Sequence, residues 1–131
     1  MFPPSSDIGA AGVLVRAASE NGSYTEIEEG RVTRALMKLF HMNNAAAATL
    51  RREAEDLLEQ STSLVSMATA AKELDSDKKE ALMSHAWSLV EAQNEDVVGQ
   101  SIFMRGIADI FGFTPERTRA LRFPPSPEMD D

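Results

Sequence analysis

The chain has 131 residues, of which 13 are Lys or Arg and 21 are Asp or Glu, so its formal net charge is −8. This length fits one domain, and the negative charge argues against a nucleic-acid binder and, more weakly, against a protein that binds anionic membranes. No cysteine is present, which excludes a disulfide framework, a thiolate zinc site and a cysteine nucleophile.

Proline-rich segments lie at both ends of the chain. Residues 1–6 contain two prolines, and residues 123–131 contain three prolines and three acidic residues. Because proline fixes φ and removes a backbone donor, neither segment is expected to continue a helix. The sequence therefore predicts an N-terminal tail at 1–6, one domain at 7–122 and an acidic C-terminal tail at 123–131.

The apolar stretch at residues 8–15 is the only candidate for a targeting or membrane segment. It is too short to span a bilayer and lacks the basic flank of a signal peptide. We therefore expect a cytoplasmic protein whose membrane association, if any, is indirect.

The first two helices of the domain are predicted from caps and spacing. Asp7 is a candidate cap for a helix that runs to about Glu20 and is rich in small residues that allow close approach to a neighbour. A turn signal follows at residues 21–23, and Thr25 with Glu28 forms a capping box that opens a second helix. The predicted inward stripe of this second helix is Val32, Ala35, Leu36, Leu39 and Phe40.

A third helix is predicted from Ala45 to about Gln60, with Asn44 as its cap. Its predicted inward face consists of Ala47, Leu50, Ala54, Leu57 and Leu58. Its other face carries the charged residues Arg51, Arg52, Glu53, Glu55, Asp56 and Glu59. A charge run of this kind is typical of a solvated helix face.

The second half of the domain predicts four further helices. They cover residues 61–74, 78–92 and 97–111, followed by a short helix from Thr114–Pro115. The second of these would open with a capping box of Asp77 and Glu80, and Gly112 suits a helix C-cap. The last helix carries the only basic patch that the sequence indicates, typical of a solvated helix end, at Arg117, Arg119 and Arg122.

These predictions together define the fold class. No stretch shows the sustained period-two alternation of a strand. About seven helical segments with short connections predict a single compact all-α bundle.

Few residues of the chain could carry chemistry. His41 and His85 have no His, Asp or Glu three or four positions further on, so a core or boundary role is the stronger interpretation for both. Met83 and Trp87 lie beside an apolar stripe, and the sequence leaves open whether they belong to the core or to an exposed contact surface. Neither a nucleophile elbow nor a phosphate-binding glycine loop is present.

An internal similarity is the most informative feature of the sequence. Two amphipathic helices end at Phe40 and Phe111, which are 71 positions apart, and polar turns at Asn21 and Gln93, 72 positions apart, precede them. Such a repeat predicts two helical hairpins that are related by a pseudo-two-fold axis and packed face to face. The alternative is that any two amphipathic helices share this much of a pattern.

The turn of the first repeat has a recognisable order of residues. Gly22 is followed by five variable residues and then by Glu28, which lies in the first turn of a helix. This order resembles the repeat of the TerB-like domain of bacterial tellurite-resistance and stress-associated proteins, in which an Asp-Gly turn precedes a helix-starting Glu. The resemblance extends over about residues 8–122 and implies an all-helical domain of two repeats.

The same resemblance implies a negatively charged surface that could bind metal. Here Asn21 stands in the Asp place, and Gln93 and Gln100 replace the Asp and Glu of the second repeat. Because cations such as Ca²⁺ prefer several charged oxygen ligands, this loss predicts weak or no metal binding. The candidate ligands for a divalent cation are Asn21, Glu26, Glu28 and Glu29. The stronger alternative for these acids is that they oppose the positive end of a helix dipole.

The sequence predicts a non-enzymatic helical module without a cofactor, and the resemblance implies that it acts as an interaction module in a bacterial stress or tellurite-resistance assembly. A domain that binds or senses a divalent metal ion is the alternative, and an enzyme is the weakest hypothesis. We expect an unidentified protein partner and no nucleic acid, and a homodimer stays open.

Overall fold

The computed structural model describes residues 4–20, 22, 24–60, 62–92 and 97–122, with the backbone alone described at 97–101 and 122. This part of the chain contains seven helices and no strand. They are α1 (Ser6–Ala18), α2 (Glu26–Phe40), α3 (Asn44–Glu59), α4 (Leu64–Ala71), α5 (Ser76–Glu91), α6 (Val97–Phe111) and α7 (Pro115–Arg122). The predicted all-α bundle is confirmed.

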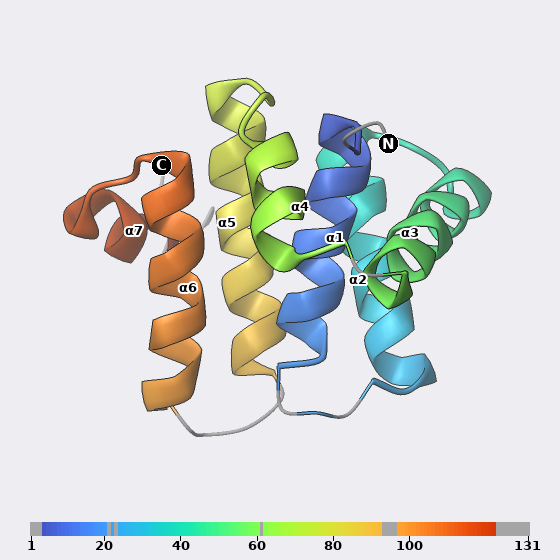
Figure 1. Cartoon of the computed structure of the whole chain (residues 1–131), viewed down its shortest axis with the longest axis horizontal. Helices are drawn as coiled ribbons and strands as arrows, with labels where there is room; N and C mark the ends of the chain where they lie inside the picture. Colours follow the sequence, from blue (N-terminus) through green and yellow to red (C-terminus); the bar gives the residue numbers. More distant parts are fainter. Residues whose placement is uncertain (1–3, 21, 23, 61, 93–96, 123–131) are drawn as a thin grey trace, which may run out of the picture.

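Two antiparallel helix pairs form the body of the molecule. Figure 1 shows α6, α5, α1 and α2 side by side, with α1 and α5 running in one direction and α2 and α6 in the other. The α1–α2 and α5–α6 pairs therefore turn at the same end of the bundle, as a two-fold rotation between α1 and α5 would require. This arrangement confirms the predicted pair of hairpins, although Asn21 and Gln93 themselves lie outside the described residues.

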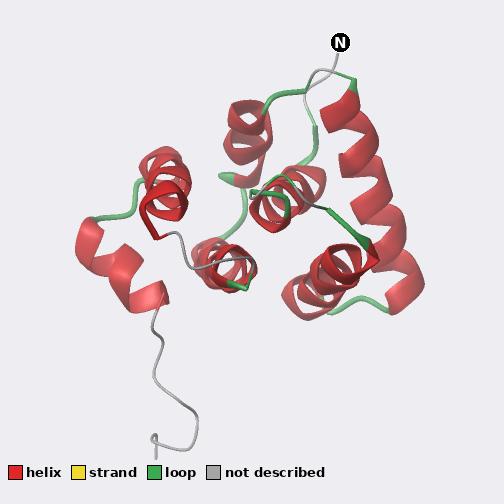
Figure 2. Ribbon diagram, turned by 90° about the horizontal axis from the view of Figure 1, so that it is seen from below, coloured by secondary structure: helices red, strands yellow, loops and turns green. Residues whose placement is uncertain are grey.

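The remaining helices cover the two pairs. The helix α4 packs on α1 and α6, α3 packs on α1 and α2, and α7 packs on α5. Figure 2 looks along the bundle and shows one helix lying lengthwise at each side of it. By their places in Figure 1, these two flanking helices are α3 and α7.

The central helix is α1, which contacts α2, α3, α4 and α5. Every residue from Gly9 to Val15 is buried, so this helix has no solvent-facing stripe over that stretch. Gly9 and Gly12 face α4 at very short range: an added Cβ atom at Gly12 would lie 2.6 Å from the Met67 sulfur. The predicted close approach of small residues in this helix to a neighbour is confirmed. Met67 on α4 packs against Gly9 and Gly12.

Three of the predicted helix starts are confirmed, and one of them is α6, which begins at Val97. Thr25 and Glu28 form the capping box of α2, and the Thr114 hydroxyl accepts the Arg117 N–H at 3.1 Å. Gly112 has φ +78°, as a left-handed helix end requires.

Three of the predicted caps are wrong, and in each case the helix begins one or two residues earlier. The caps in the structure are Ser5, Asn43 and Asp75, in place of Asp7, Asn44 and Asp77. Each accepts a backbone N–H three residues further on, at 3.2, 2.8 and 2.8 Å. Polar residues able to cap cluster at each of these starts, so local pattern alone does not choose between them.

The burial of individual side chains decides the question that the sequence left open for Met83 and Trp87. Met83 and Trp87 are 0% and 5% exposed, so the core interpretation of both residues is confirmed. On α4, Met67 and Ala68 are buried, whereas Val65 is 62% exposed.

Candidate functional site

The four candidate metal ligands differ in their surroundings in the structure. Glu28 is held by the capping box: its Oε1 accepts the N–H and the hydroxyl of Thr25, both at 2.7 Å. The hydrogen bond from the Thr25 backbone lowers the pKa of the Glu28 carboxyl. Glu26 is exposed, Glu29 is half-buried, and Asn21 lies outside the described residues.

The described residues do not bring these acids together. No three His, Asp or Glu side chains in this part of the chain are arranged to hold a metal ion. Gln93 lies outside the described residues, and the side chain of Gln100 is not described. Metal binding at the first repeat therefore stays a prediction.

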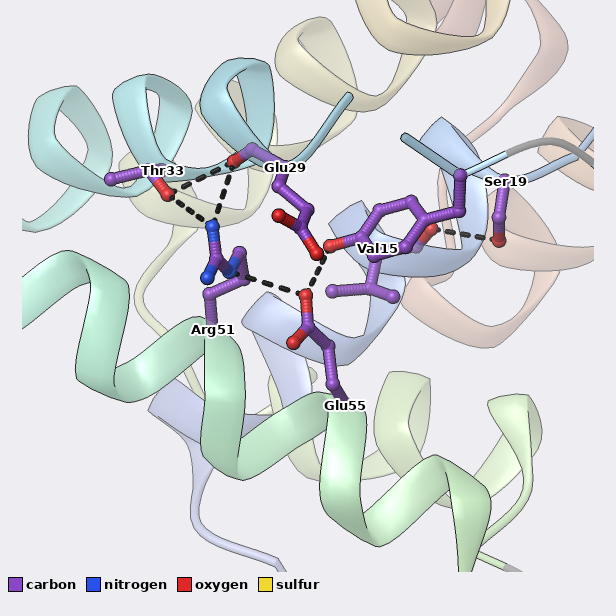
Figure 3. Close-up of polar contacts among 7 residues, drawn as sticks. Val15, Ser19, Glu29, Thr33, Arg51 and Glu55 are labelled. Atoms are coloured by element: carbon purple, nitrogen blue, oxygen red, sulfur yellow. Dashed lines mark hydrogen bonds and ion pairs between the residues drawn. The ribbon is translucent and has the colours of Figure 1, made fainter. Parts of the chain in front are cut away.

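A polar cluster joins the start of α2 to the middle of α3. We call it the Tyr24 cluster; it consists of Tyr24, Glu29, Thr33, Arg51 and Glu55. The Tyr24 hydroxyl donates to Glu55 Oε2, and Arg51 Nε forms an ion pair with the same oxygen at 3.1 Å. Figure 3 shows Glu29, Arg51 and Glu55 converging between the two helices.

The other end of the Arg51 guanidinium reaches α2. Its Nη1 donates to the Glu29 carbonyl oxygen at 3.3 Å and to the Thr33 hydroxyl oxygen at 3.2 Å. The Thr33 hydroxyl donates to the same carbonyl at 2.9 Å. One cation thus links an acid on its own helix to the backbone of the neighbouring helix.

Two members of the predicted solvated face of α3 are therefore not solvated. The Arg51 and Glu55 side chains are 13% and 20% exposed, whereas Arg52, Glu53 and Asp56 are exposed as expected. Arg51 and Glu55 lie one helical turn apart on the side of α3 that faces α2, and this packing buries them. The spacing of the pair was visible in the sequence, but their partner Tyr24, 31 residues away from Glu55, was not.

The Tyr24 phenol is locked in its protonated form. Burial raises the pKa of Tyr24 strongly, and the hydrogen bond to Glu55 and the negative charge of Glu55 raise it further. A phenol with so high a pKa donates a hydrogen bond and does not act as a base or an anionic nucleophile near neutral pH. The chemistry of the cluster is therefore that of fixed hydrogen bonds.

A surface hollow opens beside the cluster, between α1 and α3. Its lining residues are Val15, Arg16, Ser19, Tyr24, Glu29, Glu55, Leu58 and Glu59. The Ser19 hydroxyl donates to the Val15 carbonyl at 2.9 Å, so it already has a partner inside α1. Arg16 and Glu59 are exposed and present opposite charges to a molecule that approaches the hollow.

A second hollow lies between α2 and α5 and corrects a prediction about charge. It contains the basic side chains of Arg31, Arg34 and Lys38 beside His85. The cluster near Arg117 is therefore not the only basic patch. His85 is half-buried, as expected for a boundary histidine; burial lowers its pKa, and the positive charge of Lys38 lowers it further.

Comparison with known proteins adds one positive finding. The family model described as tellurite resistance protein TerB matches residues 7–123. No curated protein and no solved structure matches the chain. In the described part of the chain, no helix has both the length and the apolar character needed to cross a membrane.

Proposed function

Because the chain belongs to the tellurite resistance protein TerB family, we propose that it is a non-enzymatic helical interaction module. The family supports a role in a bacterial stress-response or tellurite-resistance assembly. The proposal includes a protein partner and a cytoplasmic location.

The Tyr24 cluster is the observation that carries this proposal. Its donors and acceptors are bonded to one another: Tyr24 donates to Glu55, Glu55 pairs with Arg51, and Arg51 donates into α2. Groups held in this way fix the shape of the adjoining hollow rather than react. A fixed polar hollow between packed helices suits recognition, because little side-chain conformational freedom is lost when a partner binds.

Glu59 offers a direct test, because it lines the hollow, is exposed, and lies on α3 beyond the Tyr24 cluster. We propose affinity capture from the native host with the full chain and with Glu59→Arg, followed by mass spectrometry. Glu53→Arg makes the same charge change at an exposed position of α3 that does not line the hollow. A partner that Glu59→Arg loses and Glu53→Arg keeps supports the proposal. Equal capture by all three chains contradicts it.

Oligomeric state is a separate arm of this test. A second copy of the chain is the alternative partner, and light scattering of the purified full chain over a range of concentrations detects it. A dimer that Glu59→Arg dissociates and Glu53→Arg keeps would identify the chain itself as the partner at the hollow.

The metal-binding alternative is tested at the same hollow, because three carboxylates line it, at Glu29, Glu55 and Glu59, although they are not arranged to hold a metal ion. Glu55, however, is already paired with Arg51 and accepts from Tyr24. We therefore expect no binding heat when calcium, magnesium, zinc or manganese is titrated into the full chain at millimolar concentration. Saturable heat that Glu29→Gln removes would favour the metal-binding function instead.

A further inference from the structure

The hollow between α2 and α5, which we call the α2–α5 groove, concentrates positive charge on an acidic protein. Its lining residues are Arg31, Arg34, Ala35 and Lys38 from α2, and His85, Ser88 and Leu89 from α5, with Ala92 at the α5 C-cap. One wall is cationic, and the remainder is small, apolar or uncharged. The formal net charge of the whole chain is −8, so the charge of this wall is opposite in sign to that of the whole chain.

Within the described part of the chain, none of the three cations forms an ion pair. The ion pairs there join Arg51 to Glu55, Lys78 to Asp75 and Arg117 to Glu80. Glu28 is close enough to Arg31 to feel its charge, but its carboxylate is held by Thr25.

Like charges three and four positions apart on a helix repel one another. Arg31, Arg34 and Lys38 have that spacing, and Lys38 also disfavours the charged form of His85 across the groove. An anion in the groove would relieve both repulsions at once.

The spacing of the three cations indicates which kind of anion would fit the groove. From Arg31 to Lys38 the cations extend along seven positions of α2, which corresponds to about 10 Å at 1.5 Å per residue. Carboxylates on alternate residues of an extended peptide are about 7 Å apart. A peptide with several acids therefore matches the row of cations better than one compact anion does.

The described part of the chain ends near the groove, and an acidic segment follows it in the sequence. The Ser84 hydroxyl on α5 donates to the Leu121 carbonyl at 2.9 Å, so the end of α7 lies one helical turn from Ser88 on the groove wall. Residues 123–131 follow and include Glu128, Asp130 and Asp131. The six residues 123–128 span up to about 20 Å when extended. Ala92, at the far end of the groove, is about 12 Å from Ser84 along α5, and the axes of packed helices such as α2 and α5 are about 8–10 Å apart. The acids can therefore reach the cations.

We propose that the acidic segment 123–131 binds in the α2–α5 groove of the same chain, with its carboxylates against Arg31, Arg34 and Lys38. A tethered segment has an effective concentration in the millimolar range, so weak ion pairs suffice to fill the groove. An acidic partner protein would have to displace this segment before it could use the same cations.

The absence of cysteine makes a clean test possible. A nitroxide attached to Ser126→Cys in the full chain broadens the amide NMR signals of residues near it. At about 0.01 M ionic strength, where the Debye length is about 30 Å, we expect loss of most of the signal at residues 31–38 and 85–92. At about 1 M, where this length is about 3 Å, the signals should return.

Two variants of the labelled chain decide whether charge is the cause. Replacing Glu128, Asp130 and Asp131 by Gln, Asn and Asn should restore the signals, and so should Arg34→Gln with Lys38→Gln. Arg52→Gln removes an exposed cation on α3, away from the groove, and should leave the broadening unchanged.

A mixing experiment tests whether the segment binds the groove of its own chain or that of a second copy. In an equimolar mixture of isotope-labelled chain without nitroxide and unlabelled chain with it, we expect no broadening of the labelled chain. Broadening there would show that the segment binds a second copy and would overturn the proposal. The proposal also fails if residues 31–38 and 85–92 keep their full signal in the singly labelled chain, or if neutralising the acids changes nothing.

Discussion

Tyr24 shows how one side chain can join two elements that are distant in the sequence. It lies just before the cap of α2, and its hydroxyl reaches Glu55 on α3, 31 residues away. The bond has a charged acceptor and a protonated donor, which makes it stronger than a bond between neutral groups. Tyr24 therefore fixes the start of α2 against α3 and, with it, one wall of the hollow.

We expect Tyr24→Phe to lower the free energy of unfolding by about 1–3 kcal/mol, because the substitution keeps the ring and removes a hydrogen bond to a charged group. Urea unfolding followed by circular dichroism measures the change. Thr49→Val removes an exposed hydroxyl from the same α3 and should change stability by less than about 0.5 kcal/mol. Equal effects of the two substitutions would mean that the Tyr24–Glu55 bond contributes no net stability.

His85 gives the fold a dependence on pH. Its pKa in the folded chain lies below the ordinary value of 6.5, because of burial first and Lys38 second. The unfolded chain therefore binds more protons as the pH falls through 6.5, and the free energy of unfolding falls until the pH is below the folded-state pKa. We expect His85→Gln to lose less stability than the wild type between about pH 7.5 and about pH 5.5.

The matched control for His85 is His41→Asn. His41 is exposed and has φ +54°, a conformation that Asn also tolerates. Urea midpoints of the three chains at both pH values provide the comparison. A pH dependence that His85→Gln leaves intact and His41→Asn removes would contradict the assignment to His85.

At the scale of the helices, the sequence indicated which segments are helical more reliably than it indicated the residues at which each helix begins and ends. All seven helices were predictable, because apolar spacing, caps and turn residues agreed along most of the chain. The starts of α1, α3, α4 and α5 were not, since residues such as Asp75 and Asp77, or Ser61 and Ser63, offer the same capping group two positions apart. The docking of each helix against its neighbours selects one of them.

The candidate site was predictable only in part for a related reason. Glu28 and its capping partner are close in the sequence, so their bond could be anticipated. The burial of Arg51 and Glu55 depends on Tyr24 and Thr33, which belong to another element. Period and spacing within one helix do not contain that information.

The contact of α1 with α4 yields a prediction at the helix scale. A methyl group on Gly9 would lie 2.8 Å from the Ala70 Cβ atom and closer still to the Met67 carbonyl oxygen, so the backbones would have to separate. We expect Gly9→Ala to cost about 1–3 kcal/mol through overpacking. Urea unfolding measures it.

The control for Gly9 is Gly106→Ala in α6. Nothing lies within 4 Å of the Cβ atom that this substitution adds, so it should gain about 0.5–1 kcal/mol from helix propensity alone. If Gly9→Ala stabilised the chain in the same way, the two helices would not be in the close contact described.

At the scale of the whole molecule, stability is distributed unevenly. The helix α1 is enclosed by four neighbours, whereas α7 packs mainly on α5. Leu14 in α1 is completely buried, and Leu121 in α7 is 8% exposed. Opening α7 exposes little of the core, but opening α1 exposes most of it.

We therefore expect amide hydrogen exchange to be slowest in α1 and fast in α7. Leu14→Ala should cost about 2–5 kcal/mol and accelerate exchange throughout the bundle. Leu121→Ala should accelerate exchange in α7 and leave α1 protected. Exchange followed by mass spectrometry distinguishes these patterns, and uniform acceleration by Leu121→Ala would show that α7 unfolds only with the rest of the chain.

The enclosure of α1 also has a consequence for synthesis on the ribosome. The helix is translated before every helix that covers it, and α5 begins 58 residues after Ala18. At about 5–20 residues per second, several seconds pass before that neighbour exists. During this time the apolar residues on all sides of α1 cannot be buried against α5. We therefore expect this nascent segment to bind chaperones that act on emerging chains.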